Sequence, residues 1–423
     1  MSASVLQTVP FLARRSLRQH ALSSGITAAS IALASGLVMA VFSINAQTYD
    51  AFTAGATAFD AVLGARGSQL QLVLNTVFHL ETSPGNLPWA AYEAIRKDNR
   101  VDAAFPYALG DNYRGFRIVG TTEEFYSYMA GQPTHAFAIK QPGRWFNPAR
   151  REAVVGSVAA ARAGLRPGVL FNPYHGLSTA ESSKHAEEYV VVGVLNSTNT
   201  PADRVIWIPL EGIYRMSGHV LRGAGQDYVA EAGKPIPPEA KEVSAVMLKL
   251  KHPQAGFSLE QLINRQGTAA TLAWPISRVM AELFDKLGWM HGVLTAVAYL
   301  VALVAAASIS ASMVNAISER QRDFAILRAL GAQRRIVFAS VVAESGAIAA
   351  AGSLLGFGVY LAILAAAYSV IRAQTGVVLD LFWFHPIFIW APVGMTILGV
   401  LAGILPAALA YGTDVASNLV PRS

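Results

Sequence analysis

Histidine and carboxylate residues that could bind a metal ion gather in one polar stretch of the sequence. His175 and His185 flank the segment YHGLSTAESSKHAEEY, which also carries Glu187 and Glu188. Neutral imidazole and carboxylate groups are suitable ligands for Zn²⁺. Because their spacing matches no metal-binding motif, we interpret the segment as a solvated loop and predict no metal site there. His175 and His185 are kept as the metal candidates, whereas four scattered histidines receive no assignment: His79, His135, His219 and His252.

No motif of a catalytic centre occurs in the sequence. G-x-S-x-G and H-E-x-x-H are absent, and no Ser/His/Asp grouping stands out. The phosphate-binding pattern G-x-x-x-x-G-K-[ST] is also absent, because the only Gly-Lys pair, Gly233–Lys234, is followed by Pro235. The chain has no cysteine, which excludes disulfides and thiolate metal sites. We therefore expect no enzyme activity in this chain and no cofactor bound by it.

A second concentration of charge lies next to two apolar runs. Residues 287–318 and 345–371 contain no Lys, Arg, Asp or Glu, whereas residues 319–335 carry five arginines and two acids. We call residues 319–335 the basic segment. Basic residues are neither dense nor interleaved with aromatic residues as a nucleic-acid groove requires, so we expect no nucleic-acid partner.

The basic segment has the pattern of a short amphipathic helix. Phe324, Leu327 and Leu330 recur every three residues, and Gly331 then supplies a helix stop. Such a helix could lie on a lipid surface or dock into a groove of a partner protein. The segment is short and tethered at both ends, so it is not needed as a membrane anchor. We therefore favour the partner protein.

Composition and apolar windows predict a membrane protein. Only 14% of the residues are charged and 53% are hydrophobic, whereas soluble domains average about 25% charged residues. A membrane helix needs roughly 20 apolar residues, and several windows of that length occur. Lys and Arg concentrate in the N-terminal segment and in the basic segment, which places both in the cytoplasm. The predicted organisation is a cytoplasmic segment at 1–20, membrane helices at 21–46, 287–318, 336–371 and 385–410, an external domain at 47–286, a cytoplasmic helix at 319–335, a short external loop at 372–384 and a cytoplasmic tail at 411–423.

The residues between the first and second membrane windows predict a large external domain. Runs of β-branched and aromatic residues predict strands at 189–197, 204–210 and 243–251. Helical spacing predicts helices at 87–98 and 258–270. The expected fold class is an α-helical membrane protein with four transmembrane helices and a large α+β domain inserted between helices 1 and 2.

Three features of the apolar windows predict contacts between helices. Glu344 is an acid within an apolar run, where a carboxylate costs roughly 2.5–3.5 kcal/mol at the bilayer centre. We expect it to contact another helix or the partner protein rather than to snorkel to water. Gly352, Gly356 and Gly358 predict close helix packing, the first two as a small-xxx-small pair. Pro406 is expected to bend or end the fourth helix.

The basic segment and the residues after it resemble the FtsX-like permeases, the membrane subunits of MacB-type (mechanotransmission, type VII) ABC transporters. In that family Glu-Arg-x-x-Glu/Asp-Ile/Phe-x-x-Leu-Arg-Ala-Leu-Gly-Ala is followed by a Glu-Ser pair. The matching residues here are Glu319, Arg320, Asp323, Phe324, Leu327, Arg328, Ala329, Leu330, Gly331, Ala332, Glu344 and Ser345. The external domain is similar to the MacB-type periplasmic core, and residues 59–74, 143–168 and 189–210 carry that similarity.

The resemblance implies a multi-pass permease subunit in a bacterial inner membrane. It implies a separate cytoplasmic ABC ATPase subunit, which binds ATP and Mg²⁺ and docks on the basic segment. The coupling residues would be Glu319, Arg320, Asp323, Phe324, Leu327, Arg328, Leu330 and Gly331. Further implied partners are a second copy of the permease, membrane lipid, and a periplasmic or outer-membrane protein. Motion driven by ATP hydrolysis would serve lipoprotein or lipid extraction, efflux or transmembrane signalling.

Two other functions are compatible with the residues. One is an ATP-independent membrane receptor or scaffold whose external domain binds a partner. The basic segment discriminates against it, since a scaffold has no need of such a helix. The other is a metal-handling transport system in which His175 and His185 bind Zn²⁺.

Overall fold

The computed structural model describes residues 3–53, 58–132, 137–176, 183–329, 331–375, 378–380 and 383–411. The chain divides into two compact units. The helical unit comprises Met1–Gln47, Leu287–Tyr368 and Leu379–Ser423, and the extramembrane domain comprises Thr48–Lys286 and Ser369–Val378.

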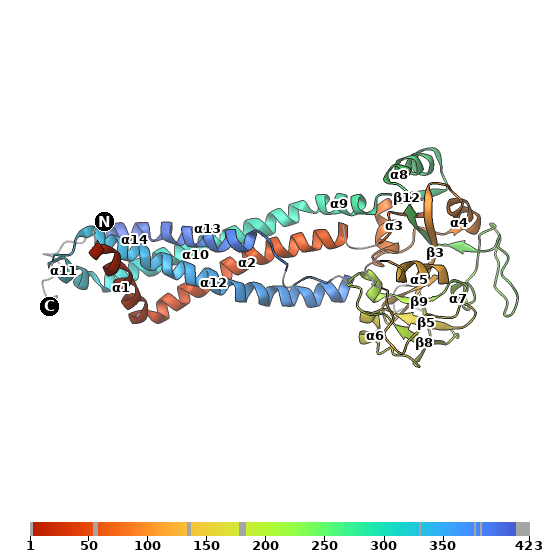
Figure 1. Cartoon of the computed structure of the whole chain (residues 1–423), viewed down its shortest axis with the longest axis horizontal. Helices are drawn as coiled ribbons and strands as arrows, with labels where there is room; N and C mark the ends of the chain where they lie inside the picture. Colours follow the sequence, from red (N-terminus) through yellow and green to blue (C-terminus); the bar gives the residue numbers. More distant parts are fainter. Residues whose placement is uncertain are drawn as a thin grey trace. The chain divides into compact units, whose positions relative to one another are not determined.

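The helical unit consists of long apolar helices and shorter pieces at their ends (Figure 1). Its elements are α1 (Ala3–Gln19), α2 (Ala21–Thr53), α10 (Gly288–Glu319), α11 (Gln321–Ala329), α12 (Arg334–Thr375), α13 (Ile387–Ala402) and α14 (Ile404–Tyr411). Within the described residues, four helices are long and apolar enough to cross a membrane: Ala21–Thr53, Gly288–Glu319, Arg334–Thr375 and Ile387–Tyr411. These are the four helices expected from the sequence, with α2 and α12 extending past the predicted ends at residues 46 and 371.

Small residues bring α2 and α12 into close contact, as the glycine pattern predicts. A Cβ atom on Gly352 would lie 2.6 Å from the carbonyl oxygen of Ala28, and one on Gly356 would lie 2.9 Å from Ser35 Cβ. Neither position has space for a larger side chain without a shift of the backbone. Gly358 differs from the expectation, because a Cβ atom at this position would have no neighbouring atom within 4 Å.

The fourth membrane helix is interrupted one turn before Pro406, which agrees with the predicted effect of that proline. Helix α13 ends at Ala402 and α14 begins at Ile404. Pro406 has no N–H group to donate to the carbonyl oxygen of Ala402, four residues earlier. Ser310 on α10 donates its hydroxyl to that oxygen at 2.7 Å. The carbonyl that the proline leaves unsatisfied thus makes a contact between helices.

The extramembrane domain is built on a mixed ten-stranded sheet with helices around it (Figure 1). The strand order is β12-β1-β11-β3-β4-β9-β5-β8-β6, with β7 paired to β3, and a separate two-stranded sheet joins β10 to β2. The strands are β1 (Ala61–Ala65), β2 (Leu87–Pro88), β3 (Val101–Tyr113), β4 (Phe116–Thr121), β5 (Glu152–Val155), β6 (Leu170–Phe171), β7 (Tyr174–His175), β8 (Tyr189–Val194), β9 (Ile206–Pro209), β10 (Glu242–Val243), β11 (Ala245–Leu250) and β12 (Ala270–Ala273). The helices are α3 (Gln69–Thr76), α4 (Trp89–Arg96), α5 (Glu123–Ala130), α6 (Ser157–Ala163), α7 (Leu210–Tyr214), α8 (Pro253–Glu260) and α9 (Ile276–Lys286), with a 3₁₀ helix at Pro201–Arg204 and a π-helix at Gln261–Gln266.

The predicted strands are confirmed as β8, β9 and β11, and the helix predicted at 87–98 is confirmed as α4. The helix expected at 258–270 is wrong in its bounds. The helical stretch begins earlier, at Pro253, turns into a π-helix at Gln261 and ends before Gly267. Residues 270–273 form the edge strand β12, because Leu272 and Ala273 are buried against β1.

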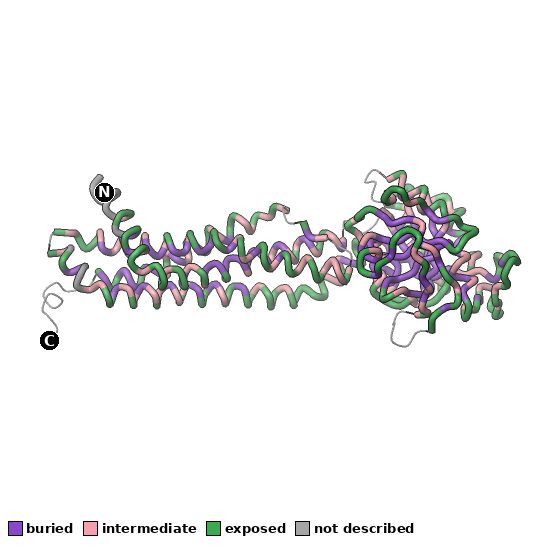
Figure 2. The backbone as a smooth tube through the Cα atoms, turned by 90° about the horizontal axis from the view of Figure 1, so that it is seen from below, coloured by how far each residue is buried: buried purple, intermediate pink, exposed green. Residues whose placement is uncertain are grey.

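Strand β3 is the element that positions polar residues for the site described below. Its first half pairs with β11 and its second half pairs with β4, and the register with β4 shifts between Leu109 and Asp111. Such an irregularity re-aims the side chains that follow it. Asp111 also pairs with His175 on β7. The domain core is apolar around these strands, and Figure 2 shows the buried segments in purple.

The glycine contacts between α2 and α12 predict different outcomes for two matched substitutions. Gly352→Ala places a methyl group against the Ala28 carbonyl oxygen, and overpacking of this kind costs about 1–3 kcal/mol. Gly358→Ala meets no atom and gains the higher helix propensity of alanine, about 0.5–1 kcal/mol. We expect a lower thermal midpoint in detergent for Gly352→Ala only, measured by size-exclusion chromatography after heating. Equal midpoints for the two variants would contradict this packing.

Candidate functional site

The basic segment begins at a buried ion pair between two helices of the helical unit. Arg320 follows α10 directly, and its two terminal nitrogens lie 3.1 and 3.3 Å from the two carboxylate oxygens of Glu344 on α12. The side chain of Glu344 is 4% exposed and that of Arg320 is 12% exposed. A paired, bidentate geometry of this kind is the strong form of an arginine–carboxylate contact. Glu344 therefore makes a contact between helices, as its place in an apolar run suggests.

Three further polar side chains extend this ion pair to α1. Ser16 donates its hydroxyl to Glu344 and accepts a hydrogen bond from Arg320. His20, between α1 and α2, lies 3.4 Å from Arg320 through Nδ1 and 3.4 Å from Glu319 through Nε2. We call Ser16, His20, Glu319, Arg320 and Glu344 the polar junction. It joins the end of α1, the end of α10 and a position about three turns into α12.

The basic segment contains the short helix and the stop that its sequence predicts. Helix α11 spans Gln321–Ala329, and its Phe324 is buried and packs with Ile317, Val337 and Ala407. Gly331 has φ +99°, and its N–H donates to the Arg328 carbonyl at 3.0 Å. Only glycine adopts this conformation readily, so the helix ends where the sequence indicates. The α11 helix is thus fixed to the bundle by one face.

The other side chains assigned to coupling are placed as follows. Arg328 on α11 is partly buried. Leu330 and the side chains of Asp323 and Leu327 lie outside the described residues. An additional apolar side chain, that of Ile326, is exposed on the surface of α11. Ile326 is not among the coupling residues expected from the sequence, because it lies outside the three-residue repeat of Phe324, Leu327 and Leu330.

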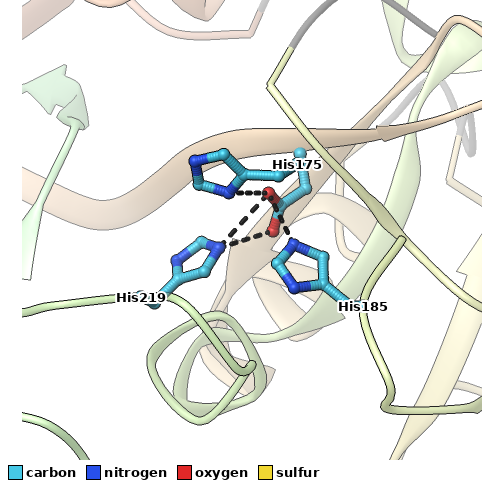
Figure 3. A group of neighbouring side chains, drawn as sticks. His175, His185 and His219 are labelled. Atoms are coloured by element: carbon cyan, nitrogen blue, oxygen red, sulfur yellow. Dashed lines mark hydrogen bonds and ion pairs between the residues drawn. The ribbon is translucent and has the colours of Figure 1, made fainter. Parts of the chain in front are cut away.

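A second polar cluster lies in the extramembrane domain, where three imidazoles surround one carboxylate (Figure 3). Asp111 Oδ1 lies 3.4 Å from His175 Nδ1 and 3.3 Å from His185 Nε2, and Asp111 Oδ2 lies 3.2 Å from His219 Nε2. One ligand atom from each residue lies within 4.8 Å of the others. We call Asp111, His175, His185 and His219 the histidine cluster.

Burial differs among the members of the histidine cluster. The Asp111 side chain is fully buried, His185 is 3% exposed and His219 is 13% exposed, whereas His175 is 53% exposed. The interpretation as a solvated loop is therefore wrong for His185. His175 and His219 line a cavity of about 390 Å³, so the cluster is accessible from that side.

The orientation of His185 is fixed by a second layer of contacts. Its Nδ1 lies 2.8 Å from the carbonyl oxygen of Ser217, which can only accept a hydrogen bond. Ser217 is held in turn by Glu187, which accepts from the Ser217 N–H at 3.1 Å and from its hydroxyl at 3.0 Å. These contacts turn Nε2 of His185 toward Asp111.

The charge state of Asp111 follows from its neighbours. Burial favours the neutral acid, but hydrogen bonds from His185 and His219 outweigh burial and lower the pKa of Asp111 to about 2. The hydrogen bond with Asp111 raises the pKa of His185. Asp111 is therefore an anion at neutral pH, in a place shielded from water.

Sequence reasoning misses two of the four residues in this cluster. His219 receives no assignment from the sequence, and Asp111 stands in no recognisable pattern, because each is distant in sequence from His175 and His185. Only the pairing of β7 with β3 and the turn after α7 bring them together. The signal that the sequence does contain is the polar segment with His175, His185 and Glu187, which supplies half of the cluster and its second layer.

Comparisons with known proteins identify two regions. Residues 24–264 match the family model described as the MacB-like periplasmic core domain, which covers more than half of the chain. Residues 295–415 match the family model described as the FtsX-like permease C-terminal region. Among solved structures, the chain is similar to the periplasmic region of MacB from Actinobacillus actinomycetemcomitans, with 11% identity, a TM-score of 0.33, and coverage of 55% of this chain and 94% of that one. No curated protein matches the chain.

The polar junction predicts strongly non-additive substitutions. Glu344→Leu leaves Arg320 buried without its partner, and Arg320→Met leaves Glu344 buried without its partner. Breaking a buried pair in this way costs about 3–5 kcal/mol. The double variant Arg320→Met/Glu344→Leu removes both charges and should regain most of that loss. Thermal midpoints in detergent measure the cycle, with Arg335→Ala as an exposed control. Additive losses would show that the two side chains do not interact.

Proposed function

Because this chain belongs to the FtsX-like permeases that carry a MacB-like periplasmic core domain, we propose that it couples ATP hydrolysis on a separate ATPase subunit to motion of its extramembrane domain. A permease role in an ABC-type transporter follows from the family. The proposal adds the docking site, the route of coupling and the location in a bacterial inner membrane. In it, the basic segment is cytoplasmic and the ATPase binds ATP and Mg²⁺.

The observation that carries the proposal is the polar junction. Arg320 begins the basic segment and is bound to Glu344 on α12 and Ser16 on α1. A displacement of α11 by a bound partner therefore acts on α10, α1 and α12 together. Because a buried ion pair resists separation, the three helices are expected to move together at this point.

The surface of α11 supports docking of a partner protein. Phe324 anchors one face of the helix in the bundle, while Ile326 is exposed on the same short helix. An exposed apolar residue on a short helix that is anchored by its other face suits a groove that accepts an apolar side chain. We assign this groove to the ATPase.

Chain continuity supports the second half of the route. Helices α2 and α12 each continue past the residues of the helical unit. Phe52 near the end of α2 and Ile371 near the end of α12 pack in the extramembrane domain's own core. Motion of either helix along its axis would thus reach this core through the polypeptide itself.

The proposed complex contains two copies of the permease and the ATPase, with a periplasmic or outer-membrane partner and membrane lipid around it. The cargo belongs to one of three classes: a lipoprotein or lipid to be extracted, a small molecule for efflux, or a periplasmic enzyme to be controlled. Affinity purification from the native membrane, with mass spectrometry of the proteins that co-elute, tests the complex. An ATPase in equal amount supports the proposal, whereas a permease that elutes alone in several detergents favours an ATP-independent receptor.

Substitutions on α11 test the docking surface directly. Ile326→Ala truncates the exposed side chain, and a central contact in a groove typically costs more than about 1 kcal/mol, or roughly fivefold or more in affinity. Arg328→Glu reverses a charge on the same helix. We expect both variants to lose permease-stimulated ATPase activity, measured with the reconstituted complex at limiting ATPase concentration after circular dichroism has verified that each variant is folded.

The matched control is Leu303→Ala, which truncates an exposed apolar residue of α10 outside the basic segment. Its stimulated ATPase activity should equal that of the unmodified complex. Unchanged activity for Ile326→Ala and Arg328→Glu would exclude α11 as the docking helix.

A further inference from the structure

The histidine cluster contains a buried negative charge that its own neighbours do not balance when they are neutral. Asp111 is fully buried, and none of the described lysines or arginines forms an ion pair with it. Burial of an unpaired carboxylate is strongly unfavourable. The groups that face it are the imidazoles of His175, His185 and His219, which carry no charge in their neutral form.

The hydrogen bonds of the cluster point more specifically to a cation site. In neutral His185 the proton is on Nδ1, because that atom donates to the Ser217 carbonyl, and Nε2 then presents a lone pair. This lone pair lies 3.3 Å from Asp111 Oδ1, so in the neutral form two acceptors face each other, and either a proton on Nε2 or a cation must lie between them. Asp111 Oδ2 is also buried. His219 Nε2 lies 3.2 Å from it, but Oδ2 accepts no well-aligned hydrogen bond among the described residues. A positive centre between these atoms would satisfy all of them.

We propose that Asp111, His175, His185 and His219 bind a divalent transition-metal ion, with Zn²⁺ as the preferred ion. This inference does not depend on the proposed coupling to an ATPase. Three imidazole nitrogens and one carboxylate oxygen are a ligand set of intermediate softness, which suits zinc and its neighbours rather than Mg²⁺ or Ca²⁺.

The distances agree with a tetrahedral zinc site. Zinc bonds of about 2.0–2.1 Å place neighbouring ligand atoms roughly 3.3 Å apart. Asp111 Oδ1 lies 3.4 Å from His175 Nδ1, 3.3 Å from His185 Nε2 and 3.3 Å from His219 Nε2. The remaining distances between ligand atoms are no longer than 4.8 Å, so small ring rotations complete the site.

The surroundings have the other features of a metal centre. Ligating histidines usually donate their second nitrogen to a carbonyl or carboxylate, and His185 does so to Ser217, which Glu187 holds in place. The half-exposed His175 and the cavity of about 390 Å³ give an ion a way in. Four protein ligands fill a tetrahedral shell, so the site fits ion binding rather than hydrolysis by a metal-bound water.

A bound ion would join four separate parts of the extramembrane domain. Asp111 is on β3, His175 is on β7, His185 precedes β8 and His219 follows α7. Binding to the folded state alone raises stability in proportion to the logarithm of ion concentration over Kd. Zinc should therefore raise the unfolding temperature of the domain and hold β7 and the 215–219 turn on β3.

The test uses the full-length chain purified in detergent through an affinity tag without histidines. The protein is stripped with EDTA, dialysed against Zn²⁺ and then against buffer, and its metal content is measured by mass spectrometry. We expect about one zinc ion per chain, retained in millimolar Mg²⁺, and an unfolding temperature that rises with zinc concentration. Co²⁺ in the same site should give the intense visible absorption of tetrahedral cobalt.

Variants locate the ion. His175→Ala and His219→Ala should lose the retained zinc, the cobalt absorption and the zinc-dependent rise in unfolding temperature. His252→Ala removes an exposed histidine outside the cluster and should behave as the unmodified protein. Glu187→Gln, which touches no ligand atom but holds Ser217, should weaken zinc binding roughly 10–100-fold.

His175 is half exposed, so His175→Ala tests the site even if the variants of buried residues fail to fold. Circular dichroism and the unfolding temperature in EDTA verify that each variant is folded. Zinc retention equal in His175→Ala, His219→Ala and the unmodified protein would overturn the proposal. Failure of the folded, unmodified protein to retain zinc would overturn it as well.

Discussion

A carboxylate removed from water must be matched by positive charge or by hydrogen-bond donors, and each candidate site of this chain is built around such a group. In the helical unit the group is Glu344, which Arg320 and Ser16 contact. In the extramembrane domain it is Asp111, which faces three imidazoles. The energetic cost of an unmatched buried charge far exceeds that of a lost apolar contact. The segments that supply the matching groups are therefore held where these two carboxylates require them.

In the helical unit, this constraint complements close packing between helices. Small residues on α2 and α12 allow the helices to approach, but apolar contact alone distinguishes poorly between neighbouring positions along a helix. The polar junction lacks this freedom. Arg320 can make both of its hydrogen bonds to Glu344 at only one relative position of the helices. Close packing thus gives affinity between helices, while the ion pair fixes their register. The proposed coupling needs this fixed register, because helices that could slide past one another would not transmit a displacement of α11.

The sequence predicted elements whose signals are local and missed contacts that depend on sheet register. Four long apolar runs identified the membrane helices, and Gly331 marked the end of α11 because glycine alone favours its conformation. Glu344 was recognisable because an acid in an apolar run needs a partner, although the sequence did not name Arg320 as that partner. Asp111 and His219 carried no such signal. Asp111 and His219 come close together through the register shift in β3 and the turn after α7. No local sequence pattern encodes either feature.

The two carboxylates are matched in chemically different ways, and the difference bears on their roles. Glu344 is matched by the guanidinium of Arg320, which belongs to the chain itself, so this match is built into the fold. At Asp111 the matching positive charge is proposed to be a bound metal ion, which is not part of the chain, so that match is exchangeable. A permanent ion pair suits a contact between helices that must persist through every cycle of ATP hydrolysis. An exchangeable match suits a site whose occupancy depends on the ions in the surrounding solution. The cavity and the half-exposed His175 put the histidine cluster in contact with that solution.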